Sequence, residues 1–383
     1  MKRTSDFIPT FIAHPLIFIT FVILIIFSYA YFNILPYIGF SYNPSSGEVQ
    51  KVFSDHPQTS LLQPGDRLLR VGDVTLEQFR TGVTGSLFEG TSPGQAVELL
   101  IQRDDKERSI SWILPGKNRA EVLDRLSSQW WISYIFWLFG TLALLIIRPR
   151  DIRCALYAFF NYLTALWLLV GSITSQNLWG SPMLLQALIW FCIPVYWQFH
   201  WNFPQPLKST RKEVWVVLYL LAACLSLGVI FHFIPLNLYF IGFILAIVGS
   251  VFLLLAQMIL HPSRRRPLTI AGVSIGLILL PIVGTSLGGF IGHLEYNSLI
   301  SMIALPLLPG FYFYAIYRYR LGGMELVANR LIVWVIYSIL LFSSALILIP
   351  ISCNQFPSSS GRNLMGVAGV LFLALVSIFL FPS

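Results

Sequence analysis

The side chains that could support catalysis are few in this sequence, and their spacing is unfavourable for it. Zinc peptidase chemistry needs two histidines one helical turn apart with a glutamate base, but none of the six histidines lies in an HExxH motif. The letters GTSLG at 284–288 match GxSxG, yet Ser286 lies in an apolar run without the preceding strand that this motif requires. His293 could share a helix face with Ser286, although glycines in such a helix more often allow close packing. We therefore expect no catalytic residues and no enzymatic activity.

The remaining residues that could bind a metal ion or carry charge across a membrane also lack the arrangement that these functions need. The cysteines lie in or at the edge of apolar runs, where cysteine usually packs as a small side chain, and none forms a CxxC pair: Cys154, Cys192, Cys224 and Cys353. No Asp, Glu, Lys or Arg lies in the middle of an apolar run, where ion-coupled transport would place one. His200 is interpreted either as an interfacial hydrogen-bonding residue or as part of a coupling site. The sequence thus predicts no metal site and no cofactor.

Long apolar runs form most of the chain and must position these residues. Only 11% of the 383 residues are charged, whereas a soluble protein carries about 25%. Each run has roughly 20 apolar residues, enough for a helix to cross the hydrocarbon core of a bilayer. The first run is too long for a signal-peptide core, so we expect it to be retained. The sequence predicts a mostly α-helical membrane protein with about ten transmembrane helices, at 15–36, 130–148, 153–175, 182–202, 214–235, 237–260, 268–292, 297–317, 331–353 and 362–381.

The positive charges indicate how these helices are oriented. The formal net charge is +8, but the segment 39–129 holds ten basic and twelve acidic residues, so the surplus lies between the apolar runs. Such clusters orient helices in the lipid bilayer, and we expect no nucleic-acid partner. By the positive-inside rule both termini lie in the cytoplasm and the polar segment lies outside the cell (inner) membrane. The connections rich in Arg and Lys are 148–153, 206–212, 261–267 and 317–330, and they alternate with the nearly uncharged 175–181, 234–237, 292–297 and 354–362.

The polar segment after the first run has the pattern of a small α/β domain. GEVQKVF (47–53) alternates apolar and polar residues like a half-buried strand, and RLLRV (67–71) predicts a second strand. In the QPGD turn between them Gly65 and Asp66 are structural, because Gly65 is free to adopt a positive φ. A helix follows from Thr75, and residues 92–114 predict a hairpin. The expected domains are the N-terminus and first span (1–37), the extracytoplasmic domain (38–116), a linker (117–129) and the multi-span domain (130–383).

The order of these motifs resembles a PDZ domain of the bacterial HtrA type. The resemblance rests on YIGF (37–40), GEVQKV, LLQPGDRLLRVGD and SPGQAVELLIQR. It implies that backbone N–H groups of the YIGF loop hold a peptide or protein C-terminus. The peptide then adds as a strand beside the edge strand, and its side chains enter pockets near the helix. The implied peptide-binding residues are Tyr37, Ile38, Gly39, Phe40, Tyr42, Phe79 and Val83. Because YIGF almost directly follows the first span, the groove could instead be pressed against lipid or occupied by the protein's own chain. A spacer or homodimer contact is then the alternative role.

Two stretches of the multi-span domain resemble sensor regions of bacterial histidine kinases. One is FHWNFPQP (199–206), and the other is YAIYRYRLGGMELVANRLIVWVIY (314–337). The layout of one span, an exported PDZ-like domain and many further spans is also that of competence-type quorum-sensing kinases. This resemblance implies reception of an extracytoplasmic ligand such as a peptide. The candidate coupling residues are His200, Arg318, Arg320, Asn329 and Arg330.

The sequence ends at FLFPS without a histidine box or an ATP-binding segment. We therefore expect a signal receptor without catalytic activity, which relays ligand binding to a cytoplasmic kinase or response-regulator partner. The alternative is a PDZ-bearing membrane adaptor or assembly factor for exported proteins or for a protease.

The topology is testable with single cysteines placed in a cysteine-free chain. Ser92→Cys in the polar segment should react with an impermeant thiol reagent in intact cells, because this segment is expected outside. Ser209→Cys and Ser263→Cys, in two Arg- and Lys-rich connections, should react only after permeabilisation. The opposite pattern at Ser92 would overturn the topology.

Overall fold

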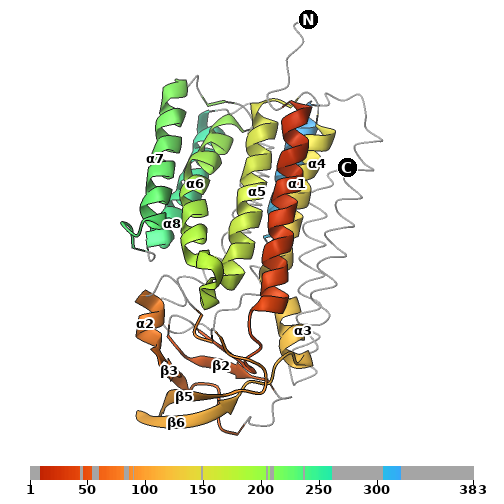
Figure 1. Cartoon of the computed structure of the whole chain (residues 1–383). Helices are drawn as coiled ribbons and strands as arrows, with labels where there is room; N and C mark the ends of the chain where they lie inside the picture. The colour runs from red at the N-terminus through yellow and green to blue at the C-terminus, as the bar shows by residue number, and fades with distance from the viewer. Residues whose placement is uncertain are drawn as a thin grey trace, which may run out of the picture.

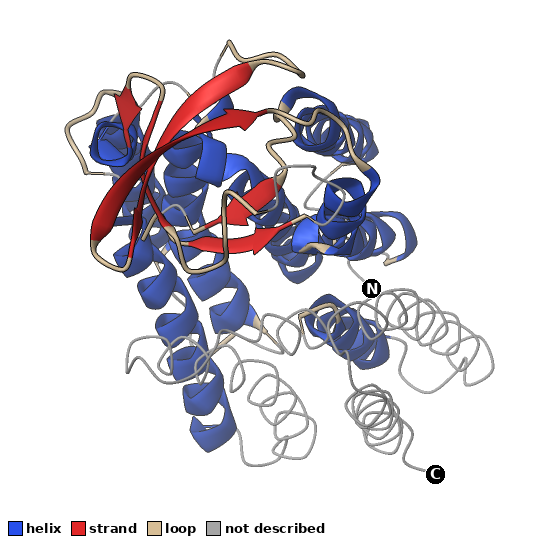
Figure 2. Ribbon diagram, turned by 90° about the horizontal axis from the view of Figure 1, so that it is seen from below, coloured by secondary structure: helices blue, strands red, loops and turns tan. Residues whose placement is uncertain are grey.

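The computed structural model of the chain consists of a bundle of long helices with a small domain at one end (Figure 1). A view from the domain end shows its strands lying across the ends of the helices (Figure 2). In sequence, the domain lies between the first and second long helices. The structure describes residues 9–43, 46–53, 60–81, 86–88, 90–147, 150–203, 206–207, 211–235, 238–260 and 305–320.

Six helices of the described part are long and apolar enough to cross a membrane, as in a multi-pass membrane protein. The first, α1 (Thr10–Tyr29), continues into a short π-helix, η1 (Ala30–Ile34). The others are α4 (Ile132–Ile146), α5 (Ile152–Ile173), α6 (Ser181–Asn202), α7 (Lys212–Ile230) and α8 (Tyr239–Leu260). These helices confirm the mostly helical architecture and the first six predicted spans.

The count of ten spans stays a prediction. Helix α11 (Leu307–Arg320) covers part of the predicted span 297–317. The predicted spans 268–292, 331–353 and 362–381 lie outside the described residues. Ser286, His293 and Cys353 lie outside them as well, so the structure gives no geometry for the GTSLG motif.

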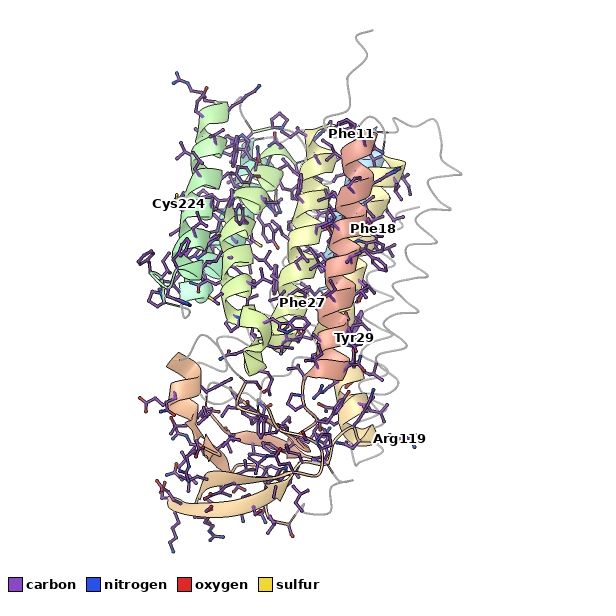
Figure 3. The ribbon with its side chains drawn as sticks, viewed as in Figure 1. Phe11, Phe18, Phe27, Tyr29, Arg119 and Cys224 are labelled. Carbon is purple, nitrogen blue, oxygen red and sulfur yellow. The ribbon has the colours of Figure 1, made fainter. Side chains whose placement is uncertain are left out.

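Helix α5 is the centre of the bundle. Of the most apolar stretch of α5, 72% of the residues are buried inside the protein, compared with 17% for α7 and 22% for α1 and α8. The exposed apolar side chains of the outer helices include Phe11 and Phe18 on α1 (Figure 3), and a bilayer would cover such a surface. Gly140 lets α4 approach α5 closely, since a Cβ atom there would lie 2.9 Å from the Tyr162 ring.

Among the connections between described helices, those rich in Arg and Lys lie at the end of the bundle opposite the small domain. Helix α4 ends and α5 begins at the end away from the small domain, and α6 ends and α7 begins there too (Figure 1). These are the connections that carry Arg and Lys clusters in the sequence. The nearly uncharged connection from α5 to α6 contacts the small domain, because Ser86 donates a hydrogen bond to Gln176 (3.2 Å). The structure is thus compatible with the alternating charge pattern, and the side that faces the cytoplasm stays a prediction.

The small domain, called here the sheet domain (Phe40–Ile113), contains two antiparallel sheets. Strands β1 (Phe40–Tyr42) and β2 (Val49–Val52) pair with each other. The second sheet has the order β4-β3-β5-β6, formed by β3 (Arg67–Val71), β4 (Val74–Thr75), β5 (Ala96–Arg103) and β6 (Lys106–Ile113). Helix α2 (Leu76–Thr81) follows β4. The predicted strands at 47–53 and 67–71, the helix after Thr75 and the hairpin at 92–114 are confirmed. Strand β1, which begins at the last residue of the predicted YIGF loop, was not predicted.

The hairpin and the core of the sheet domain follow from local sequence pattern. Asp104 and Asp105 both have positive φ (50° and 59°) between the paired residues Arg103 and Lys106, as in a two-residue hairpin turn. Alternate residues of β5 are buried, namely Val97, Leu99 and Ile101. The fully buried Trp112 of β6 donates an indole N–H to the carbonyl oxygen of Ile38 (2.7 Å). This bond ties the second sheet to the segment that leads into β1.

The turn before β3 is fixed by Gly65 and Asp66. Gly65 has a φ of 94°, which favours glycine, and nothing within 4 Å would contact an added Cβ, so the constraint there is conformational. The Asp66 carboxylate accepts the Gln63 N–H (2.8 Å) and two N–H groups of Arg103 (2.6 Å each). Burial acts to raise the pKa of Asp66, but Arg103 and the Gln63 N–H outweigh it and hold that pKa below its ordinary value.

Replacing Asp66 tests this turn. Asp66→Asn should cost about 1.5–3 kcal/mol in unfolding free energy at pH 7, because charge-assisted hydrogen bonds to Arg103 are lost. A carboxyl group with a depressed folded-state pKa stabilises the fold above its unfolded pKa of about 3.9 and loses this contribution as the pH falls further. Wild-type stability should therefore fall toward that of Asp66→Asn between about pH 5 and pH 2. Urea denaturation of the solubilised protein, followed by near-ultraviolet circular dichroism, measures both effects. Asp73→Asn, at an exposed position, is the control; equal losses in the two variants would contradict the prediction.

Candidate functional site

The residues implied in peptide binding lie together where the sheet domain meets the membrane helices. Tyr37, Ile38, Phe40, Tyr42 and Phe79 are all at least nine-tenths buried. Gly39 between them has a φ of 83°, a conformation that favours glycine. Val83 lies outside the described residues. Ile38, Phe40, Tyr42 and Phe79 belong to the apolar core of the sheet domain, and the Gly39 backbone between them is left to make polar contacts.

The Gly39 amide already has a carboxylate partner within the chain. Its N–H donates to Oε2 of Glu121 (2.9 Å), and this hydrogen bond is buried. Glu121 belongs to α3 (Arg119–Ser127), a helix within the segment predicted to be a linker. An external carboxylate could reach this amide only by displacing Glu121. One alternative from the sequence was that the protein's own chain occupies the groove. The Glu121 side chain is such an internal partner for the Gly39 amide.

The start of α3 holds Glu121 in position. The Asn118 side chain caps the helix by accepting the Glu121 N–H (2.8 Å), while its Nδ2 donates to Oε2 of Glu121 (3.2 Å). This reciprocal arrangement is a variant of the capping box, in which a side chain at the third helical position turns back toward the helix start. Here the Glu121 carboxylate turns to the amide of Gly39 as well. Helix α3 is thereby attached to the residue before β1.

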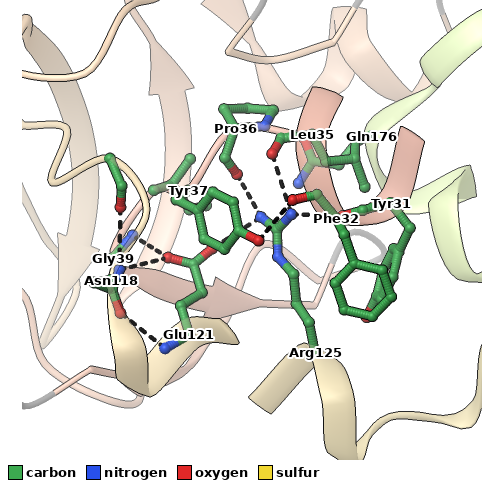
Figure 4. Close-up of polar contacts among 12 residues, drawn as sticks. Tyr31, Phe32, Leu35, Pro36, Tyr37, Gly39, Asn118, Glu121, Arg125 and Gln176 are labelled. Carbon is green, nitrogen blue, oxygen red and sulfur yellow. Dashed lines mark hydrogen bonds and ion pairs between the residues drawn. The ribbon is translucent and has the colours of Figure 1, made fainter. Parts of the chain in front are cut away.

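Arg125, one turn further along α3, binds the end of the first span (Figure 4). It donates to the carbonyl oxygens of Tyr31 (2.7 Å), Leu35 (3.1 Å) and Pro36 (2.6 Å). A helix end leaves such carbonyl groups without partners and carries a partial negative charge, so a guanidinium is well suited to this position. The same guanidinium pairs with Oε1 of Glu121 (3.0 Å) and lies over the Tyr37 ring, 3.8 Å from its centre. We call Glu121, Arg125 and the residues they bind the junction clamp.

The two charged residues of the junction clamp depend on each other. Burial raises the pKa of Glu121, and the Arg125 charge, the Gly39 N–H and Asn118 each oppose the rise. Two further hydrogen bonds close the clamp: the Tyr37 hydroxyl donates to the Phe32 carbonyl (2.7 Å), and the Tyr31 hydroxyl pairs with that of Ser128 (2.9 Å). The clamp thus joins the end of α1, the segment that enters β1 and the helix that leads to α4.

A second contact joins the sheet domain to the connection between α5 and α6. This connection consists of η3 (Thr174–Gln176) and η4 (Leu178–Gly180). Asn177 donates from Nδ2 to the Phe79 carbonyl (3.3 Å). The Tyr42 hydroxyl is buried beside Gln176 without a well-aligned hydrogen bond, and burial raises its pKa. Tyr42 of β1 and Phe79 of α2 therefore both border residues of this connection.

Three of the five predicted coupling residues lie on described helices of the bundle. His200 is buried in the bundle, where its ring nitrogens pair with the Tyr196 carbonyl (2.7 Å) and the Tyr312 hydroxyl. His200 thus forms a buried contact between α6 and α11, and both its interfacial and its coupling interpretation stay predictions. Arg318 and Arg320 lie on α11, and Asn329 and Arg330 lie outside the described residues.

The structure describes three of the four cysteines. Cys154 and Cys192 are buried, and Cys224 is exposed on α7. Among the described residues, no group of three or more His, Cys, Asp or Glu side chains could hold a metal ion.

The sequence interpretation missed the residues that dominate the junction: Asn118, Glu121 and Arg125. The pattern Asn-x-x-Glu signals a helix start, and the spacing of Glu121 and Arg125 is that of a helical ion pair. These signals could have revealed α3. Nothing in the neighbouring sequence could have revealed that the partners of α3 lie about 80 to 90 residues earlier.

Comparison of the chain with protein-family models, with curated proteins and with solved structures finds no match in any of the three.

Substitution of Arg125 tests the junction clamp. Arg125→Gln should cost about 3–5 kcal/mol in unfolding free energy, because it leaves the Glu121 carboxylate buried without its counter-charge. Arg125→Lys should cost less, since the charge remains but the planar fork that reaches several carbonyl groups is lost. Arg119→Gln, at an exposed position of the same helix, is the control and should change stability by no more than about 0.5 kcal/mol. Thermal unfolding of the detergent-solubilised chain measures the three variants. Similar melting temperatures for Arg125→Gln and Arg119→Gln would refute the clamp.

Proposed function

We propose that this chain is the receptor part of a membrane signalling system. Its sheet domain meets a ligand on the extracytoplasmic side of the cell (inner) membrane, and its helices pass the event to a cytoplasmic kinase or response-regulator partner. The chain itself carries out no reaction in this proposal. The charge pattern of the connections supports this orientation, because the Arg- and Lys-rich connections from α4 to α5 and from α6 to α7 lie at the end of the bundle opposite the sheet domain.

The single observation that carries the proposal is the junction clamp. Arg125 binds three carbonyl groups at the end of the first span, and Glu121 binds the amide before β1. Both residues belong to α3, which is followed by η2 (Gln129–Trp131) and α4. A change in the position of β1 therefore acts on two membrane helices through short, charge-assisted contacts. A domain that served only as a spacer would not need such contacts.

The ligand class that best fits this junction is a peptide with a free C-terminus. The Gly39 amide binds a carboxylate in the resting chain, so an incoming terminal carboxylate would take the place of Glu121. Such an exchange would free the Glu121 side chain from β1 and change its pairing with Arg125. Ligand binding and a shift of α3 would then be the same event, as a receptor requires.

Peptide binding to the whole chain in lipid nanodiscs tests the proposal. Isothermal titration calorimetry with a peptide library should find sequences that bind more tightly than about 1 mM, because burial of one apolar side chain contributes about 1.5–3 kcal/mol beyond the charged end. Amidation of the C-terminus should weaken these peptides about tenfold or more, since it removes the charge that replaces Glu121.

N-terminal acetylation of the same peptides is the matched control and should leave the affinity unchanged. Equal affinity for free and amidated peptides would refute the carboxylate site. Binding of folded exported proteins, with no response to any short peptide, would favour the alternative function of an adaptor or assembly factor.

A further inference from the structure

The connection from α5 to α6 lies against the sheet domain at a face formed by three of its segments. Asn177 reaches the carbonyl of Phe79 on α2, and Gln176 accepts a hydrogen bond from Ser86 just beyond α2. Gln176 also lies beside Tyr42 of β1. The contacts thus include both β1 and α2, the two elements between which the proposed peptide would enter. A peptide and this connection cannot occupy the same face together.

The backbone of the connection is strained. Asn177 and Trp179 have φ values of 51° and 55°, and Gly180 has 66°. Asparagine tolerates this left-handed region, but a bulky residue such as tryptophan rarely adopts it. Such conformations persist only where surrounding contacts hold them. Here the holding contacts are those to the sheet domain and the edge-to-face contact of Trp179 with Phe27 of α1, with ring centres 6.0 Å apart.

The contacts of this connection are weaker than those of the junction clamp. The hydrogen bonds described between it and the sheet domain, at 3.2 and 3.3 Å, join neutral groups. The clamp instead uses an ion pair and charged donors or acceptors at 2.6 to 3.2 Å. Because charge-assisted hydrogen bonds are the stronger kind, the connection should separate from the sheet domain before the clamp opens.

We propose that residues Thr174–Gly180 form a latch, an internal occupant of the sheet-domain face lined by Tyr42, Phe79 and Ser86. Ligand binding at this face releases the latch, the strained backbone relaxes, and the movement reaches α5 and α6. The role of the ligand rests on the proposed function, whereas the latch itself is a property of the resting chain. A receptor built in this way has two routes from the sheet domain to the membrane helices, of which the latch opens first.

Chemical bridging tests whether the latch is closed at rest. Ser86→Cys with Gln176→Cys, in a full-length chain whose four native cysteines are replaced by alanine, should be bridged in nanodiscs by a short bis-methanethiosulfonate reagent. The control pair is Ser109→Cys with Gln176→Cys, because Ser109 lies on β6, on the side of the sheet domain away from the bundle (Figure 1). Bridging of the first pair alone supports the latch. Equal bridging of both pairs, or of neither, overturns it.

Hydrogen exchange tests whether the latch couples the two parts. Asn177→Asp keeps the size and the tolerance for a left-handed backbone, but its carboxylate cannot donate to the Phe79 carbonyl. Exchange should become at least about tenfold faster in both 76–88 and 174–185. Ser172→Ala removes a hydrogen bond within α5, to the Leu168 carbonyl, and should leave both segments unchanged. Faster exchange in 174–185 alone would overturn the coupling.

The same experiments separate this inference from the proposed function, because neither needs a ligand. A peptide that binds in calorimetry should reduce bridging of the Ser86→Cys and Gln176→Cys pair. If no peptide binds, the receptor proposal fails, while bridging and exchange still decide whether the latch exists. If a peptide binds without reducing the bridging, the latch is not the route of the signal.

Discussion

The carbonyl groups of Tyr31, Leu35 and Pro36, at the end of the first span, need hydrogen-bond donors where the chain leaves the bundle, and Arg125 supplies them. A buried guanidinium in turn needs a counter-charge, which Glu121 provides at 3.0 Å. The second carboxylate oxygen of Glu121 then binds the amide before β1. The exit of the first span, the entry to the sheet domain and the helix toward the second span are therefore fixed by one ion pair.

This arrangement explains how the small sheet domain is held in a fixed position against the helix bundle. Its core is closed by apolar packing around Trp112, and Trp112 also bonds to the segment that carries the clamp residues. The bundle has its own core around α5. The two cores are separate, so the polar contacts between them decide how the parts move together. These polar contacts differ in strength, because the junction clamp uses charged groups and the latch uses neutral ones.

The features that the sequence predicted correctly are those encoded by neighbouring residues. Apolar runs predicted the six described spans. Alternation of apolar and polar residues predicted β2, β3 and the β5–β6 hairpin, and Gly65 predicted a turn. The site was predicted only in part. YIGF was singled out as a carboxylate-binding loop from resemblance, and the structure places a carboxylate on its glycine amide, but that carboxylate is an internal one. His200 was interpreted as an interfacial or a coupling residue, and its buried contact with Tyr312 was not predicted.

The sequence alone determined the membrane class, the alternating charge of the connections and the local elements, because hydrophobicity, helix length and turn preference act over a few residues. Only the tertiary structure decided that 117–129 is a clamping helix and that the α5–α6 connection lies on the sheet domain. Glu121 meets Gly39, and Asn177 meets Phe79, across more than 80 residues. Contacts of this kind leave no periodic pattern in either segment, since a hydrogen bond needs one donor and one acceptor and places no demand on their neighbours.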